Sequence, residues 1–438
     1  MSGPKVVRIV TREEILEICN GMLARVDAAL AEWTRVGRRN DCIDDDALVA
    51  AKRRRDALAA LVTADRFMDL QKQAPIEEAF LRDDVQVRLA KVAAKRAAAR
   101  SRDRREREAA ASLLRTLRSR GDPLSPDLER GLERGDAAAL AQGFKVLAQR
   151  SAGPTASRSL ADRLRGDEAP ASFADWLAVE PAAFADLAVT RIEARIAELR
   201  PYVEEATSTA WDARLDEALG AEPARRGLLL DGLDVATGRE LTEARARAAA
   251  AMDLELVAAE LVAAGLDATA LTMGKEALDV TAIASRIAEG RVALEKHRQA
   301  RASAARRAAV LEGLNDLGYE VTEGMRTAWA QDGRLIVRSA SRPDYGVEVN
   351  AAGERMQMRP VTFDAGGVGP DPSRDRDAET IWCGDVSALQ ETLADAGGGL
   401  VIEKALPIGA TPLKRIAVAA GDAAAAAAAP ALRERTVR

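Results

Sequence analysis

The sequence feature that most constrains the fold is a pair of long stretches without proline. No proline occurs within residues 76–122, and none occurs within residues 224–342. The first stretch also lacks glycine until Gly121. Because proline interrupts the hydrogen bonds of a helix and glycine weakens the helix, both stretches predict helices longer than the average of about 12 residues.

Aromatic residues are too few to build a wide core along these helices. They make up 3% of the chain, and none lies within residues 212–318. The hydrophobic content of 47% is therefore carried by alanine, leucine and valine. Small side chains let helices approach closely, so the sequence predicts a mainly α protein with a body of long antiparallel helices or coiled coil.

Composition also narrows the compartment and the class of partner. The formal net charge of −5 argues against a dominant nucleic-acid role. No apolar run reaches about 18 residues, so no membrane partner is expected, and the first residues lack the apolar segment of a signal peptide. Cys19, Cys42 and Cys383 give neither a disulfide framework nor a zinc spacing. These features favour a cytoplasmic protein, and we predict no cofactor.

The N-terminal part predicts one strand and three helices. Residues 6–10 form a β-prone run, and Thr11 with Glu14 forms a capping box at the start of a helix. A second helix is expected at about 46–72, antiparallel to the first. Pro75 is then expected to open a long helix that ends near residue 120.

The middle of the chain combines short and long helices. Frequent glycine and proline within residues 121–180 indicate short helices around a linker, "SAGPTASRS". Longer helices are expected at 181–219, with an interruption at Pro201, and at 239–264 and 275–317.

The composition changes at Gly318, after which five aromatic residues fall within 64 positions. "TAWAQ", Asp332-Gly333 and "RLIVRS" predict a β-hairpin, and "GVEVN" with "ERMQMRPV" predicts two further strands. A helix at 375–394 and the strand "LVIEKAL" complete an α+β region. We expect residues 6–10 to pair with the open edge of its sheet.

These patterns divide the chain into five segments. The α+β segment is long enough to bury a core of its own. The segments are a helical hairpin with a long helical arm (1–120), a short-helix connection (121–180), a long-helix coiled-coil region (181–317), an α+β domain with an antiparallel sheet of four or five strands (318–420) and a disordered alanine-rich tail (421–438).

The sequence offers no catalytic residue. The single histidine, His297, lies in a predicted helix at an expected exposed position, and one histidine argues against a multi-histidine metal site. The Gly-Lys pair of "MGKEAL" lacks the spaced glycine and the Ser or Thr of a phosphate-binding loop, so it indicates a helix start. Cys383 has no basic neighbour in sequence and is predicted to be a buried structural thiol.

Two acidic clusters have the oxygen ligands that hard cations prefer. Both Asp41–Asp46 and the segment 371–379 lie at the start of a predicted helix, where carboxylates also complement the helix dipole. Ser373 is the predicted N-cap in the second cluster, whose carboxylates are Asp371, Asp375, Asp377 and Glu379. A metal-dependent hydrolase or nucleotidyl enzyme with its site in this loop is therefore an alternative function.

A basic stretch is the clearest sign of a partner. Residues 88–120 contain 12 Lys or Arg and 3 Asp or Glu. Such a stripe can contact phosphates or an acidic protein, or it can be solvated or paired with acidic neighbours. The predicted contact residues are Arg96, Arg100, Arg102, Arg104 and Arg105.

The Pro-Asp-Tyr-Gly turn is a second candidate contact site, in which Arg342 and Tyr345 are predicted to form a recognition loop. Turn chemistry alone also explains this pattern. Long alanine-rich helices offer few shaped pockets, whereas a small sheet with loops presents a specific surface. The sequence therefore predicts a non-catalytic scaffold or adaptor whose C-terminal α+β domain binds a protein partner within a larger assembly. A nucleic-acid-associated subunit that uses residues 88–120 is an alternative, and homo-oligomer formation is left open.

Overall fold

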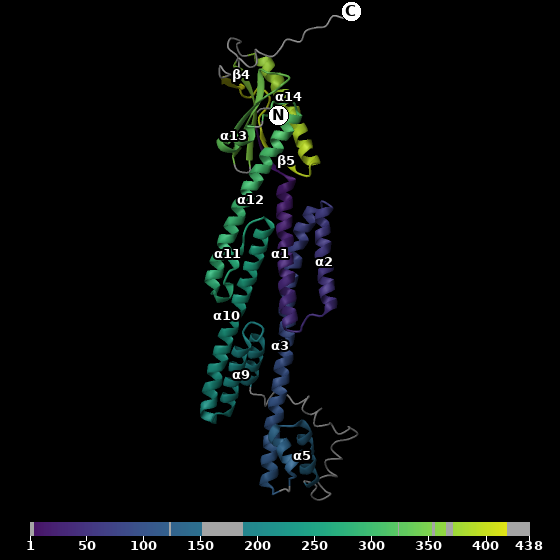
Figure 1. Cartoon of the computed structure of the whole chain (residues 1–438), viewed down its shortest axis with the longest axis vertical. Coiled ribbons are helices and arrows are strands. Elements are labelled where there is room, and N and C mark those ends of the chain that lie inside the picture. Colours follow the sequence, from purple (N-terminus) through teal and green to yellow (C-terminus); the bar gives the residue numbers. More distant parts are fainter. Residues whose placement is uncertain are drawn as a thin grey trace, which may run out of the picture. The chain divides into compact units, whose positions relative to one another are not determined.

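A computed structural model describes residues 4–121, 124–150, 187–322, 324–352, 355–364 and 371–417 (Figure 1). The described chain is mainly helical, with one six-stranded sheet built largely from the C-terminal part. This arrangement confirms the predicted fold class of long helices with a small α+β module. The predicted linker at 151–159 and the predicted tail at 421–438 lie outside the described residues.

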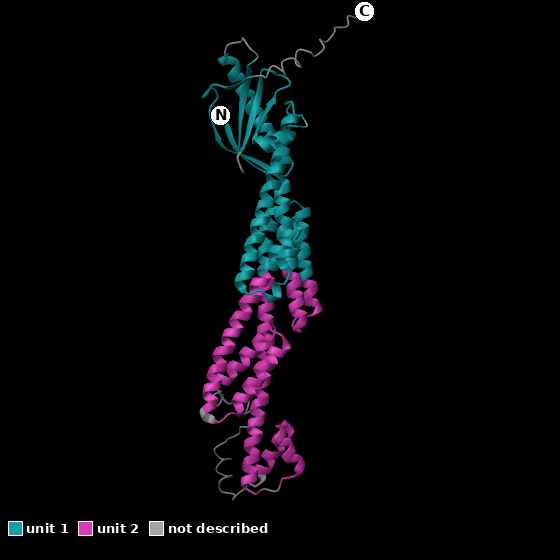
Figure 2. Cartoon of the chain, turned by 60° about the vertical axis from the view of Figure 1, so that its left-hand side comes forward, with its two compact units in different colours: residues 1–28, 51–78, 253–438 teal, residues 29–50, 79–252 magenta. Residues whose placement is uncertain are grey.

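The chain forms two compact units (Figure 2). Unit 1 consists of residues 1–28, 51–78 and 253–438, and unit 2 consists of residues 29–50 and 79–252. Both units combine residues that are far apart in sequence, so the predicted five-segment domain organisation stays a prediction. The helices that contribute residues to both units are α1 (Arg12–Arg39), α2 (Asp45–Thr63), α3 (Phe67–Ser119) and α10 (Pro223–Ala263).

The start of α1 is the capping box that the sequence predicts. The Glu14 amide donates to Thr11 Oγ1 at 3.4 Å, and the Thr11 amide donates to Glu14 Oε1 at 3.2 Å. These reciprocal bonds satisfy two of the amide groups that a helix leaves unpaired at its N-terminus. The start of α1 is therefore fixed by local side chains.

The junction between α2 and α3 differs from the prediction. Helix α2 ends at Thr63, well before residue 72, because Asp65 adopts a left-handed conformation with φ 54°. Helix α3 then begins before Pro75, which lies inside it, so the prediction that proline opens this helix is wrong. Full burial of Leu70 and Ala74 stabilises the turns before Pro75 and offsets the hydrogen bond that proline does not make.

Charged side chains join the helices of unit 1. Arg25 of α1 donates to Glu78 of α3 at 2.7 Å and to Glu260 of α10 at 2.8 Å. Arg298 of α12 (Val280–Asp316) donates to the same Glu260 at 2.8 Å. The hydrogen bond that Arg25 donates to Glu78 raises the pKa of Arg25 further above its usual value, in spite of burial. Among the described residues, no helix combines the length and apolar character needed to cross a membrane.

Unit 2 contains the short helices that the sequence predicts after residue 121. The chain breaks its helical course around Pro201, as expected, between α8 and α9. Apolar side chains here gather in several small clusters. Among the described residues, the helices that lie wholly in unit 2 are α4 (Pro126–Arg134), α5 (Ala137–Arg150), α8 (Leu187–Leu199) and α9 (Glu205–Gly220).

The sheet of unit 1 joins the two ends of the described chain. Its order is β2-β3-β4-β1-β5, and β6 pairs with β4 in parallel. The N-terminal strand pairs with this sheet as predicted, but it lies between β4 and β5 and not at an open edge. The strands are β1 (Lys5–Val10), β2 (Arg334–Arg338), β3 (Tyr345–Ala352), β4 (Arg355–Asp364), β5 (Gly399–Ala405) and β6 (Lys414–Ala417).

One predicted strand of this region is a helix. The segment "TAWAQ" belongs to α13 (Met325–Asp332), so the predicted hairpin around Asp332-Gly333 is wrong. Gly333 has φ 65° and its amide donates to the Trp329 carbonyl at 2.9 Å, which ends the helix. Helix C-caps and tight hairpin turns both favour glycine at positive φ. The same dipeptide therefore fits both structures, and burial of the Trp329 side chain in the core selects the helix.

We call β1 together with residues 318–417 the sheet module. One face of its sheet is covered by the end of α12, by α13 and by α14 (Pro372–Asp395). Trp329 and Trp382 are each 1% exposed in this core, beside the fully buried Val7 and Ile9 of β1. The core is therefore continuous across segments from both ends of the chain.

Candidate functional site: a cleft on the sheet module

The turn between β2 and β3 contains the predicted recognition residues and is held in place by main-chain hydrogen bonds. The Tyr345 amide donates to the Arg342 carbonyl at 2.9 Å, which closes the turn. The Asp344 carbonyl accepts from the Phe363 amide of β4 at 2.9 Å and from the Thr362 hydroxyl at 3.2 Å. The turn is thus fixed to β4 as well as to the strands that it connects.

Gly346 follows this turn at a position that has no room for a side chain. A Cβ atom there would collide with the Val337 carbonyl and with the Phe363 ring. The Arg338 guanidinium lies 4.5 Å from the centre of the same ring, an ordinary cation–π distance. Close packing under the turn therefore limits its freedom to rearrange.

Helix α14 begins with a cap that sequence reasoning assigned to the wrong residue. Asp371, and not Ser373, is the N-cap, and its carboxylate accepts from the Ser373 and Arg374 amides at 3.0 and 3.3 Å. Pro372 occupies the first helical turn, where it loses no hydrogen bond. A carboxylate accepts these bonds more strongly than a neutral hydroxyl does, which accounts for the choice.

The turn and the start of α14 meet in a cleft of about 350 Å³. The Tyr345 hydroxyl donates to the Asp375 carboxylate at 3.2 Å and links the two elements. Ile381 of α14 lines the cleft and is 44% exposed, which is unusual for a large apolar side chain beside charges. The charged residues that line the cleft are Arg342, Asp344, Arg374 and Asp377.

Two tyrosines of this region have altered acidity. Burial, followed by the Asp375 carboxylate, raises the pKa of Tyr345 to about 12. Burial also raises the pKa of Tyr319, whose hydroxyl donates to Asp385 at 2.6 Å. Both phenols are therefore neutral hydrogen-bond donors throughout the physiological pH range.

Most of the acidic residues predicted in the segment 371–379 have hydrogen-bond partners within the protein, which indicates structural roles. Glu379 is 2% exposed and its carboxylate accepts from the Gly409 amide, while Asp371 caps the helix. Asp375 accepts a hydrogen bond from the Tyr345 hydroxyl. Of the four acidic residues predicted in the segment 371–379, only Asp377 lines the cleft as an exposed carboxylate. Within the described ranges, no group of three or more His, Cys, Asp or Glu side chains has an arrangement that could hold a metal ion.

The predicted basic contact residues of α3 are divided between two environments. Arg100 pairs with Asp212 and with Asp216 of α9. Arg104 donates to Glu193 of α8 at 3.0 Å. Arg102 and Arg105 are exposed and Arg96 is half-buried. Two of the five side chains are therefore engaged by carboxylates within unit 2.

Two other residues singled out in the sequence have surroundings that sequence spacing did not reveal. His297 is half-buried in α12 and not exposed as expected. Cys383 of α14 is half-buried and lies 3.4 Å from the Nζ atom of Lys5, a residue of β1 that is 2% exposed. The fold thus gives this thiol a basic neighbour that is 378 residues away in sequence.

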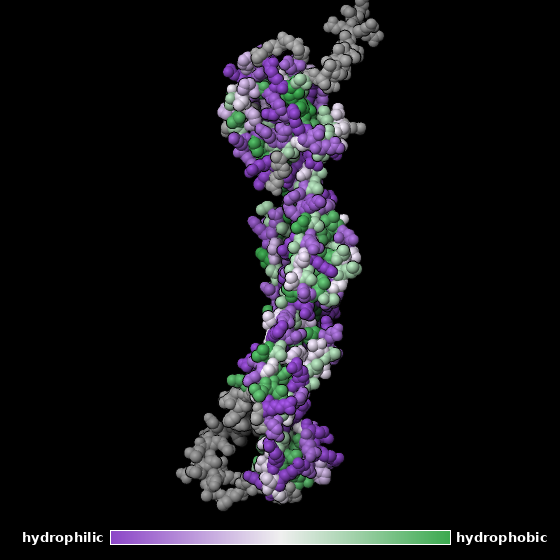
Figure 3. Space-filling model, turned by 90° about the vertical axis from the view of Figure 1, so that its left-hand side faces the viewer, coloured by the Kyte–Doolittle hydropathy of each residue, from purple (hydrophilic) through white to green (hydrophobic). Residues whose placement is uncertain are grey.

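Sequence reasoning missed Arg374 and Ile381 as cleft residues. The signal for Ile381 was present, because it is an apolar residue outside the stripe that recurs at spacings of three and four along α14, namely Ala378, Trp382, Val386, Leu389 and Leu393. Figure 3 shows that the visible face of the sheet module is largely hydrophilic, with small separate hydrophobic patches.

Comparisons with models of protein families, with curated proteins and with solved structures find no match to this chain.

Proposed function

We propose that this protein is a non-catalytic scaffold or adaptor whose sheet module binds a protein partner at the cleft between the β2–β3 turn and α14. The observation that supports this role most directly is the composition of the cleft. An exposed isoleucine lies among two arginines and two aspartates, on elements held rigidly by main-chain hydrogen bonds. A central apolar anchor with a charged rim is the usual composition of a protein-binding surface.

The two alternative functions have less support. For nucleic acid, Arg100 and Arg104 would first have to leave their carboxylate partners on α8 and α9. For a metal-dependent enzyme, Asp371, Asp375 and Glu379 already accept hydrogen bonds from the protein itself. The partner-binding role requires no such rearrangement.

Affinity capture with three forms of the full chain tests this proposal. Ile381→Asp places a charge in the cleft, and Val401→Asp makes the same change at a 58% exposed position of β5 in the same module. We expect a protein captured by the wild-type chain to be retained by Val401→Asp and lost by Ile381→Asp. Equal capture by both variants would contradict the assignment of the cleft.

The same samples should be compared by thermal melting. Both substitutions lie on exposed side chains, so each is expected to change stability by less than about 0.5 kcal/mol. A normal melting curve for Ile381→Asp would show that the loss of the partner comes from the cleft and not from unfolding.

A further inference from the structure

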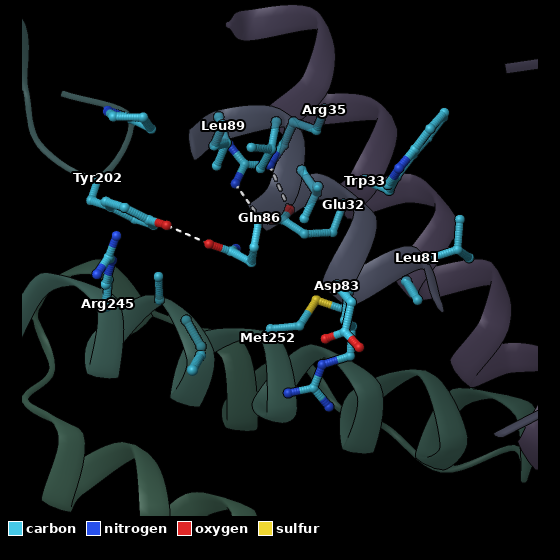
Figure 4. A pocket seen from close by; sticks show the side chains of 18 of the residues that line it. Glu32, Trp33, Arg35, Leu81, Asp83, Gln86, Leu89, Tyr202, Arg245 and Met252 are labelled. Atoms are coloured by element: carbon cyan, nitrogen blue, oxygen red, sulfur yellow. Dashed lines mark hydrogen bonds and ion pairs between the residues drawn. The ribbon is translucent and has the colours of Figure 1, made fainter. Parts of the chain in front are cut away.

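A groove in unit 2 and the buried pair of Lys5 and Cys383 in the sheet module lie outside the proposed partner-binding cleft. The groove has a volume of about 470 Å³ and is lined by parts of α1, α3 and α10 (Figure 4). Charged and apolar side chains are mixed along it, because Asp83 lies beside Met252. The groove therefore favours no single class of ligand, whereas the lysine–cysteine pair has a defined chemistry.

Lys5 is almost completely buried, although lysine is among the residue types that proteins rarely bury. Lys5, Val7 and Ile9 alternate along β1 and are each no more than 2% exposed, so they face the helices that cover the sheet. A buried ammonium group needs a hydrogen-bond acceptor. Within the part of the chain that the structure describes, that acceptor is the Cys383 sulfur of α14, at 3.4 Å from Lys5 Nζ. The fold therefore holds a nitrogen donor against this sulfur.

The Cys383 thiol has different surroundings from the other two cysteines of the chain. Burial raises the pKa of Cys19 and of Cys42 above the ordinary value for a thiol, which keeps both protonated at neutral pH. Cys383 is half-buried and accepts a hydrogen bond from a lysine ammonium. A cation next to a thiol favours the thiolate, which is the form that oxidants attack. Cys383 therefore combines partial exposure with a positive neighbour, as oxidation-sensitive cysteines do.

We propose that Lys5 and Cys383 form an oxidative crosslinking site, at which a peroxide joins Cys383 Sγ to Lys5 Nζ. In the first step the thiolate attacks one oxygen of hydrogen peroxide, and the O–O bond breaks. The departing hydroxide takes a proton from the Lys5 ammonium and leaves as water. Cys383 is then a sulfenic acid, and Lys5 is a neutral amine.

The second step forms the bond between sulfur and nitrogen. The amine lone pair attacks the sulfur, the S–O bond breaks, and hydroxide leaves with a proton from the nitrogen as a second water. The sulfur has then lost two electrons to the peroxide, and the chain has lost two hydrogen atoms. The product is a sulfenamide, which belongs to the reversible products of cysteine oxidation. A dithiol restores the thiol and the amine and is itself oxidised to a disulfide.

The crosslink connects β1 to α14 within unit 1. It joins residues that are 378 positions apart in sequence, and covalent closure of so long a loop lowers the entropy of the unfolded chain. The N-terminal strand then stays attached to the sheet module for as long as the bond persists. We expect oxidation to raise the melting temperature of the protein by about 5 °C or more.

Peptide mapping of the full chain after treatment with an equimolar amount of hydrogen peroxide tests the proposal. Under non-reducing conditions we expect a linked pair of peptides that contain Lys5 and Cys383, lighter than the two separate peptides by two hydrogen atoms. Dithiothreitol should release both peptides. Detection of Cys383 only as the thiol or as a sulfinic acid, with no linked pair, would overturn the proposal.

Two matched variants separate the crosslink from a general effect of oxidation. Lys5→Met keeps a buried hydrocarbon chain without the amine, whereas Lys404→Met removes the amine of an exposed lysine on the neighbouring strand β5. We expect oxidation to raise the melting temperature of the wild type and of Lys404→Met, and to leave that of Lys5→Met unchanged. An equal rise in Lys5→Met would show that the stabilisation does not come from the proposed bond.

Discussion

The sheet module and unit 2 are stabilised in different ways. The module has one continuous core that includes both Trp329 and Trp382 and extends to buried residues at the end of α12. The helices of unit 2 bury leucine, isoleucine, valine and alanine in several small clusters, and Arg100 and Arg104 join them through ion pairs. A large aromatic side chain buries about 150–250 Å², so a few of them can unite a core that many alanines cannot.

This difference accounts for where a specific site can form. A rigid sheet with a buried aromatic core positions loops such as the β2–β3 turn and the start of α14. Helices that pack through small clusters leave a groove between them, as α3 and α10 do. The comparison therefore predicts large effects from changes in the module core and smaller effects from changes at single contacts of unit 2.

Deletion of residues 1–10 should have the largest effect. It removes the strand between β4 and β5, together with the fully buried Val7 and Ile9. The loss should be comparable with the whole stability of a domain, about 5–15 kcal/mol, so the module should not fold. Near-ultraviolet circular dichroism checks this, with Arg8→Gln on the exposed side of β1 as the control. A deletion variant with an unchanged spectrum would refute the role of β1.

Truncation of a core tryptophan should have the second largest effect on stability. Trp382→Ala removes a side chain that is 1% exposed and should lower the free energy of unfolding by about 3–5 kcal/mol. Trp211→Ala in unit 2 removes a partly buried side chain at the margin of two clusters and should cost less, about 1–2 kcal/mol. Urea denaturation measures both values. Equal losses of unfolding free energy in the two variants would contradict the difference between the sheet module and unit 2.

Loss of the buried ion pair between Arg104 and Glu193 in unit 2 should have the third largest effect on stability. The Glu193 side chain is 1% exposed and that of Arg104 is 11% exposed, so Glu193→Gln leaves a largely buried guanidinium with only the exposed Glu108 carboxylate, at 3.4 Å. We expect a loss of about 3 kcal/mol. The matched change Glu243→Gln affects an exposed pair with Arg239 and should cost under about 0.5 kcal/mol. If the two variants unfold at the same urea concentration, the pair does not stabilise unit 2.

The smallest predicted effect is the pH dependence that Glu348 confers on the module. Burial raises the pKa of Glu348, but hydrogen bonds from Arg359 and Lys414 outweigh burial and hold the pKa below the ordinary value of 4.5. The folded state therefore binds fewer protons than the unfolded state, so this contribution to stability is present above pH 4.5 and lost as pH falls. Melting of wild type and Glu348→Gln between pH 6 and 3 should converge on acidification. A constant difference would exclude this contribution.

Short sequence patterns predicted most of the helices and strands. The prediction was wrong where the same residues suit two different local structures. The capping box of Thr11 and Glu14 and the strand segments "GVEVN" and "ERMQMRPV" of β3 and β4 depend on neighbours in sequence, so they could be read directly. Asp332-Gly333 suits a hairpin turn and a helix end equally, and burial of Trp329 decided between them. Packing of this kind involves residues distant in sequence.

Only part of the candidate cleft could be predicted, because the segments that form it are distant in sequence. Arg342 and Tyr345 were identifiable from turn composition, and the acidic segment 371–379 from its charge. That these two segments meet, through the Tyr345–Asp375 hydrogen bond, follows only from the way β3 and α14 pack in the module. The inner position of β1 and the contact of Lys5 with Cys383 likewise depend on the sheet order.

Site-specific photo-crosslinking in the full chain tests the central claim most directly. A photoreactive residue would replace Ile381 in the cleft, Arg102 on α3 or Leu228 on α10, all of which are exposed. We predict that the protein partner forms a crosslinked adduct from position 381 and none from positions 102 and 228. Adducts from positions 102 and 228 without one from position 381 would show that the helices of unit 2, and not the sheet module, provide the specific surface.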